Sequence, residues 1–511
     1  MKTHIRNISL AFLAGIAGFA AFPPLDISFA AWFCLLPLLL TVEPGKPREN
    51  FFYGYLAGVV FFASLLYWLV NVSVPGMIIL VLALSVFYGL FALLAGYIRK
   101  YSMSLLILPF IWVVLEFIRG NLFTGFPWAL LGYTQYRNLN LIQIADITGT
   151  YGVSFIIVAF NTAVYAVSIR SKRRISYMMI ALIFMLASTS YGIYRLNNLH
   201  RWGSPRISVV QGNIPQSYKW DPSYADEIMA GYTALTRQAA GDDTSLIIWP
   251  ETSYPYLFEE GTQEAETIKE LASEVKTPIL AGMVSRRAEG YYNTAVLFDG
   301  AGRIREKYLK THLVPFGEYV PFEGALNVVR KYIDKPIGDF EEGDEYTVFP
   351  VSSLTAITRP DGTLVRTTNF FRFGVLICFE DIFPYITRNF VNNGANFMVN
   401  MTNDAWFGKT AAPLQHMQAS VFRAVENRVP VIRAANTGIS CFIDPQGKVT
   451  EKVQSAGENI FIKGYATSSV NVLYGKSYYT VYGDLFVYFC AFMLAVLFIT
   501  EGFLLRKENR S

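Results

Sequence analysis

Three residues with reactive side chains lie at or beside the ends of apolar runs, and Cys378 is the first of them. It follows the apolar run Phe373–Ile377 and precedes the acidic residues Glu380 and Asp381. A cysteine at the end of a buried strand is presented at a sheet edge, and it becomes a nucleophile when a neighbouring cation or base favours the thiolate. A buried cysteine taken alone is more often a small core residue, so Cys378 needs such partners elsewhere in the chain.

Glu251 and Lys310 are the candidate partners. Glu251 follows the apolar run Leu246–Trp249, where a carboxylate is suited to act as a general base. Lys310 lies in the apolar, proline-bearing stretch Tyr308–Pro321, where a buried ammonium would favour a thiolate and stabilise an oxyanion. Each also has an ordinary interpretation, an acid at a loop or helix start for Glu251 and a solvated surface lysine for Lys310. The combination is therefore more informative than any one residue.

The composition is that of a membrane protein. Of the 511 residues, 53% are hydrophobic and 16% are charged, whereas soluble domains have about 45–50% and about 25%. The net charge of +4 is too small to indicate a nucleic-acid partner. The four cysteines and four histidines show no CxxC or ligand spacing, which predicts neither a disulfide framework nor a metal site.

Eight apolar stretches predict a polytopic helical bundle. A hydrocarbon core of about 30 Å requires about 20 residues of helix. The first stretch follows Lys2 and Arg6 as a signal peptide would, but it lacks a small-residue cleavage site, so we expect it to be retained. The predicted spans are 7–23, 26–42, 51–72, 76–98, 103–118, 152–170, 175–195 and 482–505.

The basic residues between these spans predict the topology. With eight spans, every short connection that carries Lys or Arg, and both termini, fall on one side, which the positive-inside rule makes the cytoplasm. The turns at 23–26 and 72–76 contain no Lys or Arg and fall on the other side. The inverted topology, with a cytoplasmic catalytic domain, would place four basic clusters on the wrong side. We therefore expect a membrane domain (1–195) with an outer loop (119–151), an outer domain (196–481) and a last span with a cytoplasmic tail (482–511).

The outer segment 196–481 alternates strand-like and helix-like patterns. Such alternation is typical of an α/β domain whose sheet is largely buried. Because open α/β sheets carry reactive groups at their strand ends, Glu251, Lys310 and Cys378 are the ionisable residues to weigh as candidates for a site. Apolar runs at 206–211, 245–249, 277–283, 292–298, 373–377 and 396–400 predict strands, and the patterns at 222–240, 263–275 and 411–428 predict helices.

The order and spacing of the three residues resemble the Glu-Lys-Cys triad of the nitrilase superfamily. The matching segments are Trp249–Glu251, Lys310–Glu318 and Ile377–Glu380. Further segments make the chain similar to the membrane-integrated apolipoprotein N-acyltransferases, namely Val210–Trp220, His312–Pro321, Asn403–Gly408 and Gly125–Trp128. The resemblance covers essentially the whole chain. It implies an α-β-β-α sandwich for the outer domain, together with about eight transmembrane helices.

The resemblance implies a two-step acyl transfer at a bacterial inner membrane, with the catalytic domain in the periplasm. Cys378 would attack the acyl ester of a phospholipid, typically phosphatidylethanolamine, and form a thioester. The α-amino group of a diacylglyceryl-cysteine at the N-terminus of an apolipoprotein would then take the acyl chain, without any cofactor. Glu251 would act as the base, while Lys310 and the backbone N–H of Phe379 would stabilise the oxyanion.

The resemblance also assigns supporting and substrate-binding residues. Glu318 would hold Lys310, and Glu380 would lie beside the nucleophile. The family often has tyrosine directly after the cysteine, whereas this chain has Phe379, which puts any role of a phenolic hydroxyl there in doubt. Core packing is the ordinary alternative for aromatic residues in this set. The residues expected near the substrates are Trp220, Asn293, Trp406, Phe407 and Trp128.

Two other functions remain open on the sequence. The same triad would serve a membrane-anchored amidase that hydrolyses small amides or nitriles. A transporter or receptor with a ligand-binding outer domain is a different class, and the scarcity of charged residues in the predicted spans disfavours it. The expected partners are the phospholipid donor, the diacylated apolipoprotein and membrane lipids, and a monomer is the default expectation.

Overall fold

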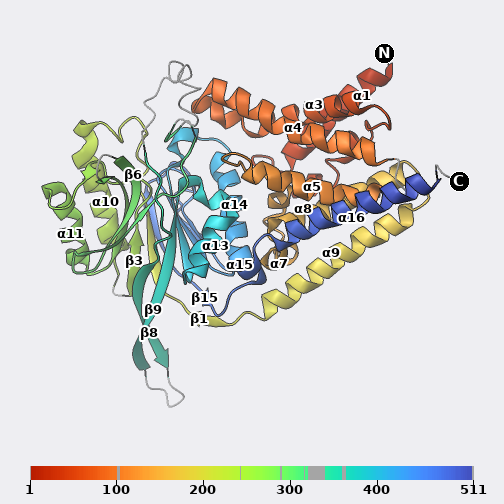
Figure 1. Cartoon of the computed structure of the whole chain (residues 1–511). Coiled ribbons are helices and arrows are strands. Elements are labelled where there is room, and N and C mark those ends of the chain that lie inside the picture. The colour runs from red at the N-terminus through yellow and green to blue at the C-terminus, as the bar shows by residue number, and fades with distance from the viewer. Residues whose placement is uncertain are drawn as a thin grey trace. The chain divides into compact units, whose positions relative to one another are not determined.

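The structure, a computed structural model, describes residues 2–99, 104–241, 243–287, 290–315, 317–319, 340–358 and 364–508. The chain divides into two compact units (Figure 1). The first comprises residues 1–198, 410–422 and 477–511, and the second comprises residues 199–409 and 423–476. Residues 410–422 lie inside the predicted outer domain by sequence but cluster with the first unit.

Long helices build the first unit, and glycine lets neighbouring helices approach closely. A Cβ atom on Gly15 would lie 2.7 Å from the Ala57 carbonyl oxygen, and one on Gly58 would lie 2.9 Å from Ser85 Cα. Small residues favour such pairing in lipid, where the hydrophobic effect between helices is weak. The long helices are α1 (Lys2–Ala20), α3 (Pro47–Leu65), α4 (Val74–Ile98), α5 (Ser104–Asn121), α8 (Thr150–Ser168), α9 (Arg174–Asn197) and α16 (Leu485–Glu508).

Among the described residues, three helices are long and apolar enough to cross a membrane by length and composition: α4, α8 and α9. The prediction of eight spans is therefore supported only in part. The predicted span 26–42 is not one helix, because it divides into the 3-10 helix η1 (Ser28–Trp32) and the short helix α2 (Leu36–Leu39). Phe33 at the end of η1 has a φ of −131°, and Pro37 lies at the start of α2, where proline is tolerated.

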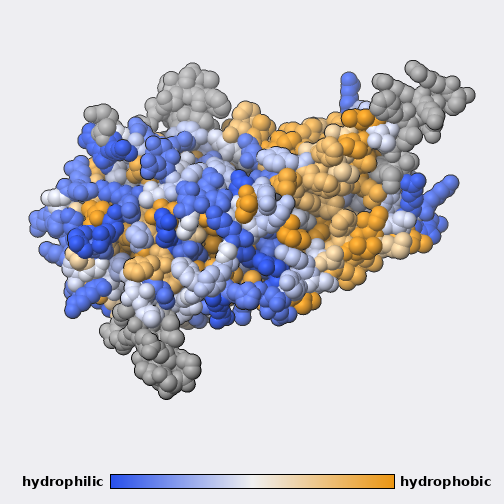
Figure 2. Space-filling model, turned by 60° about the horizontal axis from the view of Figure 1, so that its bottom comes forward, coloured by the Kyte–Doolittle hydropathy of each residue, from blue (hydrophilic) through white to orange (hydrophobic). Residues whose placement is uncertain are grey.

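Hydrophobic side chains lie on the outside of the first unit. Ile79 of α4, Leu186 of α9 and Phe492 of α16 are 66%, 62% and 63% exposed. Figure 2 shows hydrophobic surface gathered over the helices of this unit, whereas the visible surface of the second unit is mainly hydrophilic. Contiguous apolar surface of this kind is unfavourable in water, and it indicates that lipid contacts these helices.

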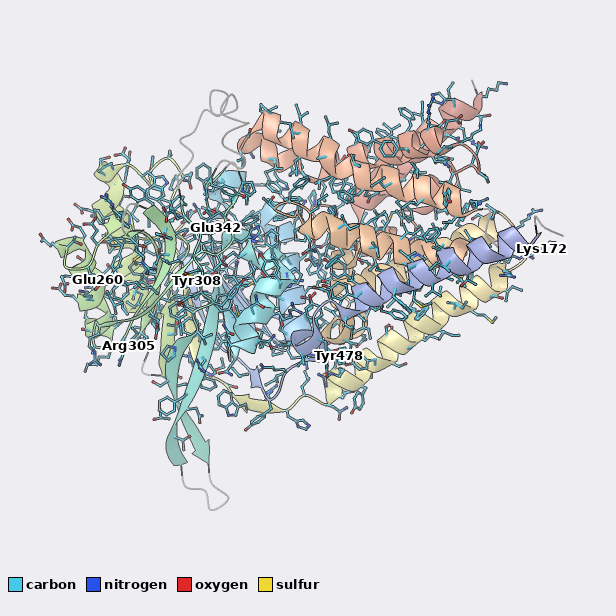
Figure 3. All side chains as sticks on the ribbon, in the orientation of Figure 1. Lys172, Glu260, Arg305, Tyr308, Glu342 and Tyr478 are labelled. Atoms are coloured by element: carbon cyan, nitrogen blue, oxygen red, sulfur yellow. The ribbon has the colours of Figure 1, made fainter. Side chains whose placement is uncertain are left out.

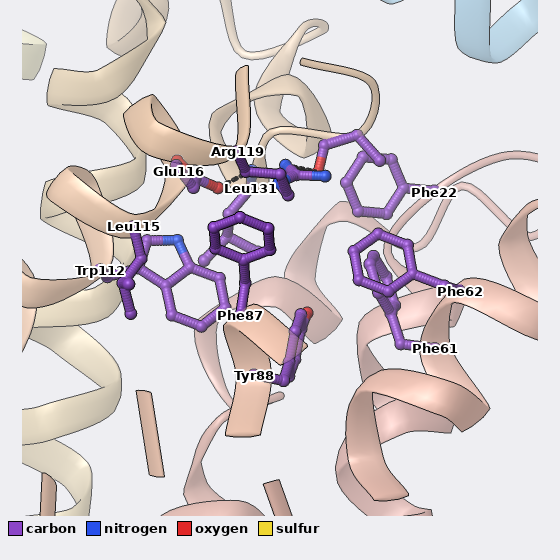
Figure 4. Close-up of a pocket in the computed structure, with 11 residues that line it drawn as sticks. Phe22, Phe61, Phe62, Phe87, Tyr88, Trp112, Leu115, Glu116, Arg119 and Leu131 are labelled. Carbon is purple, nitrogen blue, oxygen red and sulfur yellow. Dashed lines mark hydrogen bonds between the residues drawn. The ribbon is translucent and has the colours of Figure 1, made fainter. Parts of the chain in front are cut away.

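The predicted outer loop 119–151 contains the short helices η3 (Leu131–Gln135), α6 (Leu139–Ile142) and α7 (Ala145–Thr148). Two buried charged residues near the end of α5, Glu116 and Arg119, hold the first part of this loop in place. Arg119 Nη1 donates to the Trp128 carbonyl oxygen at 2.8 Å, and the Leu131 N–H donates to Glu116 Oε1 at 2.7 Å. Both charged residues line a pocket whose other walls are mainly aromatic (Figure 4). The two charged residues therefore fix the backbone at both ends of the segment Trp128–Leu131.

Gln415 joins four parts of the first unit. Its Oε1 atom accepts hydrogen bonds from the indole N–H groups of Trp68 (3.1 Å) and Trp128 (3.0 Å). Its Nε2 atom donates to the carbonyl oxygens of Pro23 (2.9 Å) and Leu65 (3.2 Å). Because an indole N–H can only donate, the two tryptophans also determine which end of the amide is the oxygen.

We expect Gln415→Ala to destabilise the first unit by about 3 kcal/mol, since it leaves buried donors and acceptors without their partner. Thermal unfolding of the full chain in detergent measures this as a lower midpoint. Asn138→Ala is the control, because Asn138 is an exposed amide of the same unit. Equal midpoints for the two variants would contradict a structural role for Gln415.

The second unit is an α-β-β-α sandwich, as the resemblance predicts. Its two main sheets have the strand orders β14-β2-β3-β5-β6-β7 and β13-β12-β11-β10-β9-β8. Helices α10 (Ala225–Ala239) and α11 (Gln263–Val275) pack on the first sheet and α13 (Pro384–Asn392) packs on the second (Figure 1). The strands are β2 (Arg206–Gln211), β3 (Thr244–Ile248), β5 (Ile279–Arg287), β6 (Gly290–Phe298), β7 (Ile304–Leu309), β8 (Phe349–Thr358), β9 (Leu364–Ile377), β10 (Phe397–Thr402), β11 (Val431–Ala435), β12 (Cys441–Ile443), β13 (Val449–Lys452) and β14 (Gly464–Ser469).

The six predicted strands of this unit correspond to β2, β3, β5, β6, β9 and β10. The predicted helix 263–275 has the observed bounds of α11, and the predicted helix 411–428 corresponds to α14 (Ala412–Asn427). The predicted helix 222–240 begins as the 3-10 turn η4 (Pro222–Tyr224) and continues as α10. Most strand ends lie within a few residues of the predicted limits because the apolar runs are bounded by polar or proline residues. The exception is β9, which begins at Leu364, well before the predicted run 373–377.

Candidate active site

Cys378 lies on a sharp turn directly after β9. Its φ of 56° is in the left-handed region, which a non-glycine residue adopts only when the surrounding structure holds it there. The Asn400 side chain on the neighbouring strand β10 does so in part, by donating from Nδ2 to the Cys378 carbonyl oxygen at 2.8 Å. The turn therefore projects the sulfur from the end of a buried strand, as the sequence predicts.

Lys310 follows β7 and is completely buried. Its Nζ atom lies 2.9 Å from Glu318 Oε1 and 3.9 Å from Glu251 Oε1. Burial acts to lower the pKa of Lys310, but Glu318, Cys378 and Glu251 outweigh it, so the pKa lies above its ordinary value. The residue is therefore a permanent cation, and its ammonium lies 5.5 Å from the centre of the Phe379 ring, where a phenyl face offers a cation–π contact.

Asn293 of β6 connects the two carboxylates that face Lys310. Its Nδ2 atom donates to Glu251 Oε1 at 2.8 Å and to Glu318 Oε1 at 3.0 Å. The other oxygen of Glu318 accepts the backbone N–H of Val314 at 2.8 Å. These contacts hold the Glu251 carboxylate in one orientation, with Glu318 as the nearer ion-pair partner of the lysine.

The surroundings of Cys378 disfavour its thiolate. Burial raises its pKa well above the usual value, Glu251 raises it further, and the Lys310 ammonium acts in the opposite direction. A thiol in this state attacks a carbonyl only if a base removes its proton during the step. The arrangement therefore favours general-base activation by Glu251 over a preformed thiolate.

Glu380 links the cysteine turn to the lysine segment. Its Oε2 atom accepts the Ile377 N–H at 2.7 Å. Its Oε1 atom accepts from the Tyr308 hydroxyl (2.8 Å), the Thr311 N–H (2.9 Å) and the His312 N–H (3.1 Å). Figure 3 shows Tyr308 inside the second unit, with Glu260 and Arg305 on its outer side. One buried carboxylate therefore sets the position of Lys310 relative to Cys378.

We expect Glu380→Gln to lower stability by about 3 kcal/mol and to slow acylation of Cys378, because the new amide NH₂ would face backbone donors that need an acceptor. Thermal unfolding and the rate of acyl-enzyme formation measure the two effects. Glu451→Gln, an exposed glutamate on β13, is the control. Wild-type values for Glu380→Gln would show that this carboxylate does not hold the loop.

The structure brings together Glu251, Lys310, Cys378, Glu318, Phe379, Glu380 and Asn293. It leaves Trp220 and Trp406 of the same unit 52% and 36% exposed, and Phe407 half-buried, which keeps them available to contact a lipid. Trp128 belongs instead to the first unit and is only 5% exposed. The sequence interpretation missed Asn400 and Lys219, since neither carries a local pattern that separates it from an ordinary polar residue.

Known proteins match this chain along nearly its whole length. The family model of the apolipoprotein N-acyltransferase N-terminal domain matches residues 14–163, and that of carbon-nitrogen hydrolases matches residues 206–470. An apolipoprotein N-acyltransferase of Geobacter metallireducens is 38% identical, over 96% of this chain and 94% of that protein. One of Haemophilus influenzae is 33% identical, over 98% and 96%. The chain therefore belongs to the apolipoprotein N-acyltransferases, within the carbon-nitrogen hydrolase superfamily.

Proposed function

We propose that this protein transfers an acyl chain from a phospholipid to the N-terminal S-diacylglyceryl-cysteine of apolipoproteins, through a thioester on Cys378. Membership of the family supports the reaction class. The observation that carries the residue assignment is the buried cluster in which Lys310 lies 3.9 Å from Glu251 and within electrostatic reach of Cys378. A buried cation, a positioned carboxylate and a strand-end thiol are the groups that acyl transfer through a cysteine requires.

In the first half-reaction, Glu251 takes the thiol proton while the Cys378 sulfur bonds to the ester carbonyl carbon. Negative charge develops on the carbonyl oxygen, where Lys310 and the Phe379 backbone N–H stabilise it. Collapse of this adduct breaks the carbon–oxygen bond, and Glu251 returns the proton to the departing glycerol oxygen. A lysophospholipid leaves, and the acyl chain remains on sulfur as a thioester.

In the second half-reaction, the α-amino group of the diacylglyceryl-cysteine attacks the thioester carbonyl. Glu251 removes a proton from the attacking nitrogen, and Lys310 again stabilises the oxyanion. The carbon–sulfur bond then breaks, the thiolate regains a proton from Glu251, and an amide is released. A thioester suits this order because it reacts with an amine more readily than the starting oxygen ester does, so one hard step becomes two easier ones.

The proposal places the reaction at a bacterial inner membrane, with residues 196–481 in the periplasm and both termini in the cytoplasm. A membrane domain of about eight spans (1–195 and 482–511) would keep the site beside lipid substrates. Moving an acyl chain into water would cost about 0.8 kcal/mol per CH₂ group, so a site at the bilayer surface avoids a large penalty. Phosphatidylethanolamine is the proposed donor, and the proposed active form is a monomer.

The test is the intact mass of the purified protein after incubation with phosphatidylethanolamine. We expect one added acyl mass that hydroxylamine removes, as it does for thioesters. A diacylated lipopeptide should then clear the adduct and gain the same mass. Absence of the adduct together with release of ammonia from small amides would favour the amidase instead, and absence of both reactions would return a ligand-binding role to consideration.

A further inference from the structure

Lys219 is a buried lysine in the turn after β2. It is 4% exposed, although its neighbours Tyr218 and Trp220 are 41% and 52% exposed. The Tyr218 N–H donates to the Pro215 carbonyl oxygen at 3.0 Å, and the Tyr218 ring stacks on Tyr224 with ring centres 4.0 Å apart. The turn therefore directs the two aromatic side chains outward and the lysine inward.

Two asparagines hold the backbone of this turn in place. Asn436 accepts the Ile214 N–H at 2.9 Å and donates to the Ile214 carbonyl oxygen at 2.8 Å. Asn403 donates to the Gln216 side chain at 2.8 Å and accepts from Asn436 at 3.0 Å. A lysine on a turn with this support is ordered before any substrate arrives.

The Lys219 ammonium lies beside the backbone of the proposed general base. Its Nζ atom donates to the backbone carbonyl oxygen of Glu251 at 2.9 Å. Burial lowers the pKa of Lys219 to about 8, while the Glu251 carboxylate and the Cys378 thiolate act to raise it. The carbonyl contact holds this buried ammonium next to Glu251, where its charge can act on the ionisable groups of the site.

The negative charge around Lys310 is a reason for the site to contain a second cation. Lys310 Nζ already faces two carboxylates, Glu318 at 2.9 Å and Glu251 at 3.9 Å, so its positive charge is balanced before any oxyanion forms. We propose that Lys219 is a positioning residue and the second cation of the active site, which holds the backbone of Glu251 and stabilises negative charge on the Cys378 sulfur. Its part in acyl transfer rests on the proposed function, whereas its effect on the sulfur can be measured without a lipid.

The experiment is the rate at which iodoacetamide alkylates Cys378 in the full-length protein, followed by peptide mass between pH 6 and 10. Only the thiolate reacts, so the rate reports how strongly the site stabilises it. We expect Lys219→Met to slow alkylation about tenfold below the thiol pKa, which corresponds to an upward shift of about one pH unit. Lys219→Arg should restore part of the rate because it keeps the charge, and Lys448→Met, an exposed lysine of the same unit, should match wild type.

The wild-type profile provides a measurement that does not depend on the folding of a variant. As Lys219 loses its proton near pH 8, stabilisation of the thiolate falls, so the logarithm of the rate should rise with a slope below one around that pH. Burial raises the pKa of Glu380 to about 7, so ionisation of Glu380 lowers the slope at lower pH, and only the change near pH 8 should disappear in Lys219→Met. A slope of one throughout, or wild-type alkylation of Lys219→Met, would overturn the inference. Slower alkylation of Lys219→Met with an unshifted profile would also overturn it, since that would show a merely structural role. A protein that shows the expected alkylation but forms no thioester with phosphatidylethanolamine would refute the proposed function alone.

Discussion

Cys378→Ala is expected to abolish the acyl-enzyme and to reduce acyl transfer by at least about a thousandfold, because alanine has no atom that can hold the acyl chain. The turn should survive, since alanine has the same Cβ and the Asn400 contact is made to the backbone of residue 378. The measurement is the intact mass after incubation with phosphatidylethanolamine, followed by a lipopeptide chase. The variant should unfold close to the wild-type midpoint while carrying no added acyl mass.

Cys441→Ala is the matched control for the nucleophile. Cys441 is also in the second unit and is fully buried in β12, but it has no place in the proposed chemistry. Its loss should cost about 1 kcal/mol of stability through a small cavity and leave the thioester unchanged. An acyl adduct of normal yield on Cys378→Ala, or its disappearance from Cys441→Ala, would remove Cys378 from its proposed role.

Cys378→Ser separates the two half-reactions further. A hydroxyl in place of the thiol is a weaker nucleophile, and an oxygen ester is a poorer acyl donor to an amine than a thioester. We therefore expect slow acylation and still slower transfer, so that any adduct persists through the lipopeptide chase and resists mild hydroxylamine. Rapid transfer from the serine variant would show that sulfur is not required.

Lys310→Met is expected to have the second large effect, on stability and on rate together. Removing the ammonium leaves Glu318 and Glu251 with Asn293 as the shared side-chain donor. Breaking a buried ion pair by deleting one partner costs about 3–5 kcal/mol, because the remaining charge is left uncompensated. Loss of one oxyanion donor slows acyl chemistry by about 10²–10³. Thermal unfolding and single-turnover acylation measure the two losses.

Two further variants distinguish the lysine's roles. Lys307→Met removes a surface lysine whose side chain is 37% exposed and pairs with Glu260, so it should change stability by less than about 0.5 kcal/mol. The double variant Lys310→Met with Glu318→Gln removes both members of the buried pair. It should recover stability but not rate, since the uncompensated charge is gone and the oxyanion still lacks its cation. Recovery of the rate would mean that Lys310 acts only through the fold.

The sequence by itself predicted the candidate reactive residues and the α/β class of the second unit. Glu251 and Cys378 could be recognised because each follows an apolar run, and a strand that ends in a polar residue places that residue at a sheet edge. Alternating strand and helix patterns indicated an α/β domain, and the family resemblance implied the sandwich. The predicted helix 263–275 has the bounds of α11. These features are local, since they depend on which residues a short segment must bury.

Only the tertiary structure decided how the reactive residues are supported. Asn293 holds Glu318 because strand β6 meets the segment after Lys310, and Glu380 holds Thr311 although 69 positions separate them along the chain. The same is true of Gln415, whose partners lie hundreds of residues away, and of Lys219, which a turn directs inward between two exposed aromatic residues. Hydrogen-bond partners of this kind depend on sheet register and loop packing. The sequence pattern of one segment cannot predict them, because the second partner lies in a distant part of the chain.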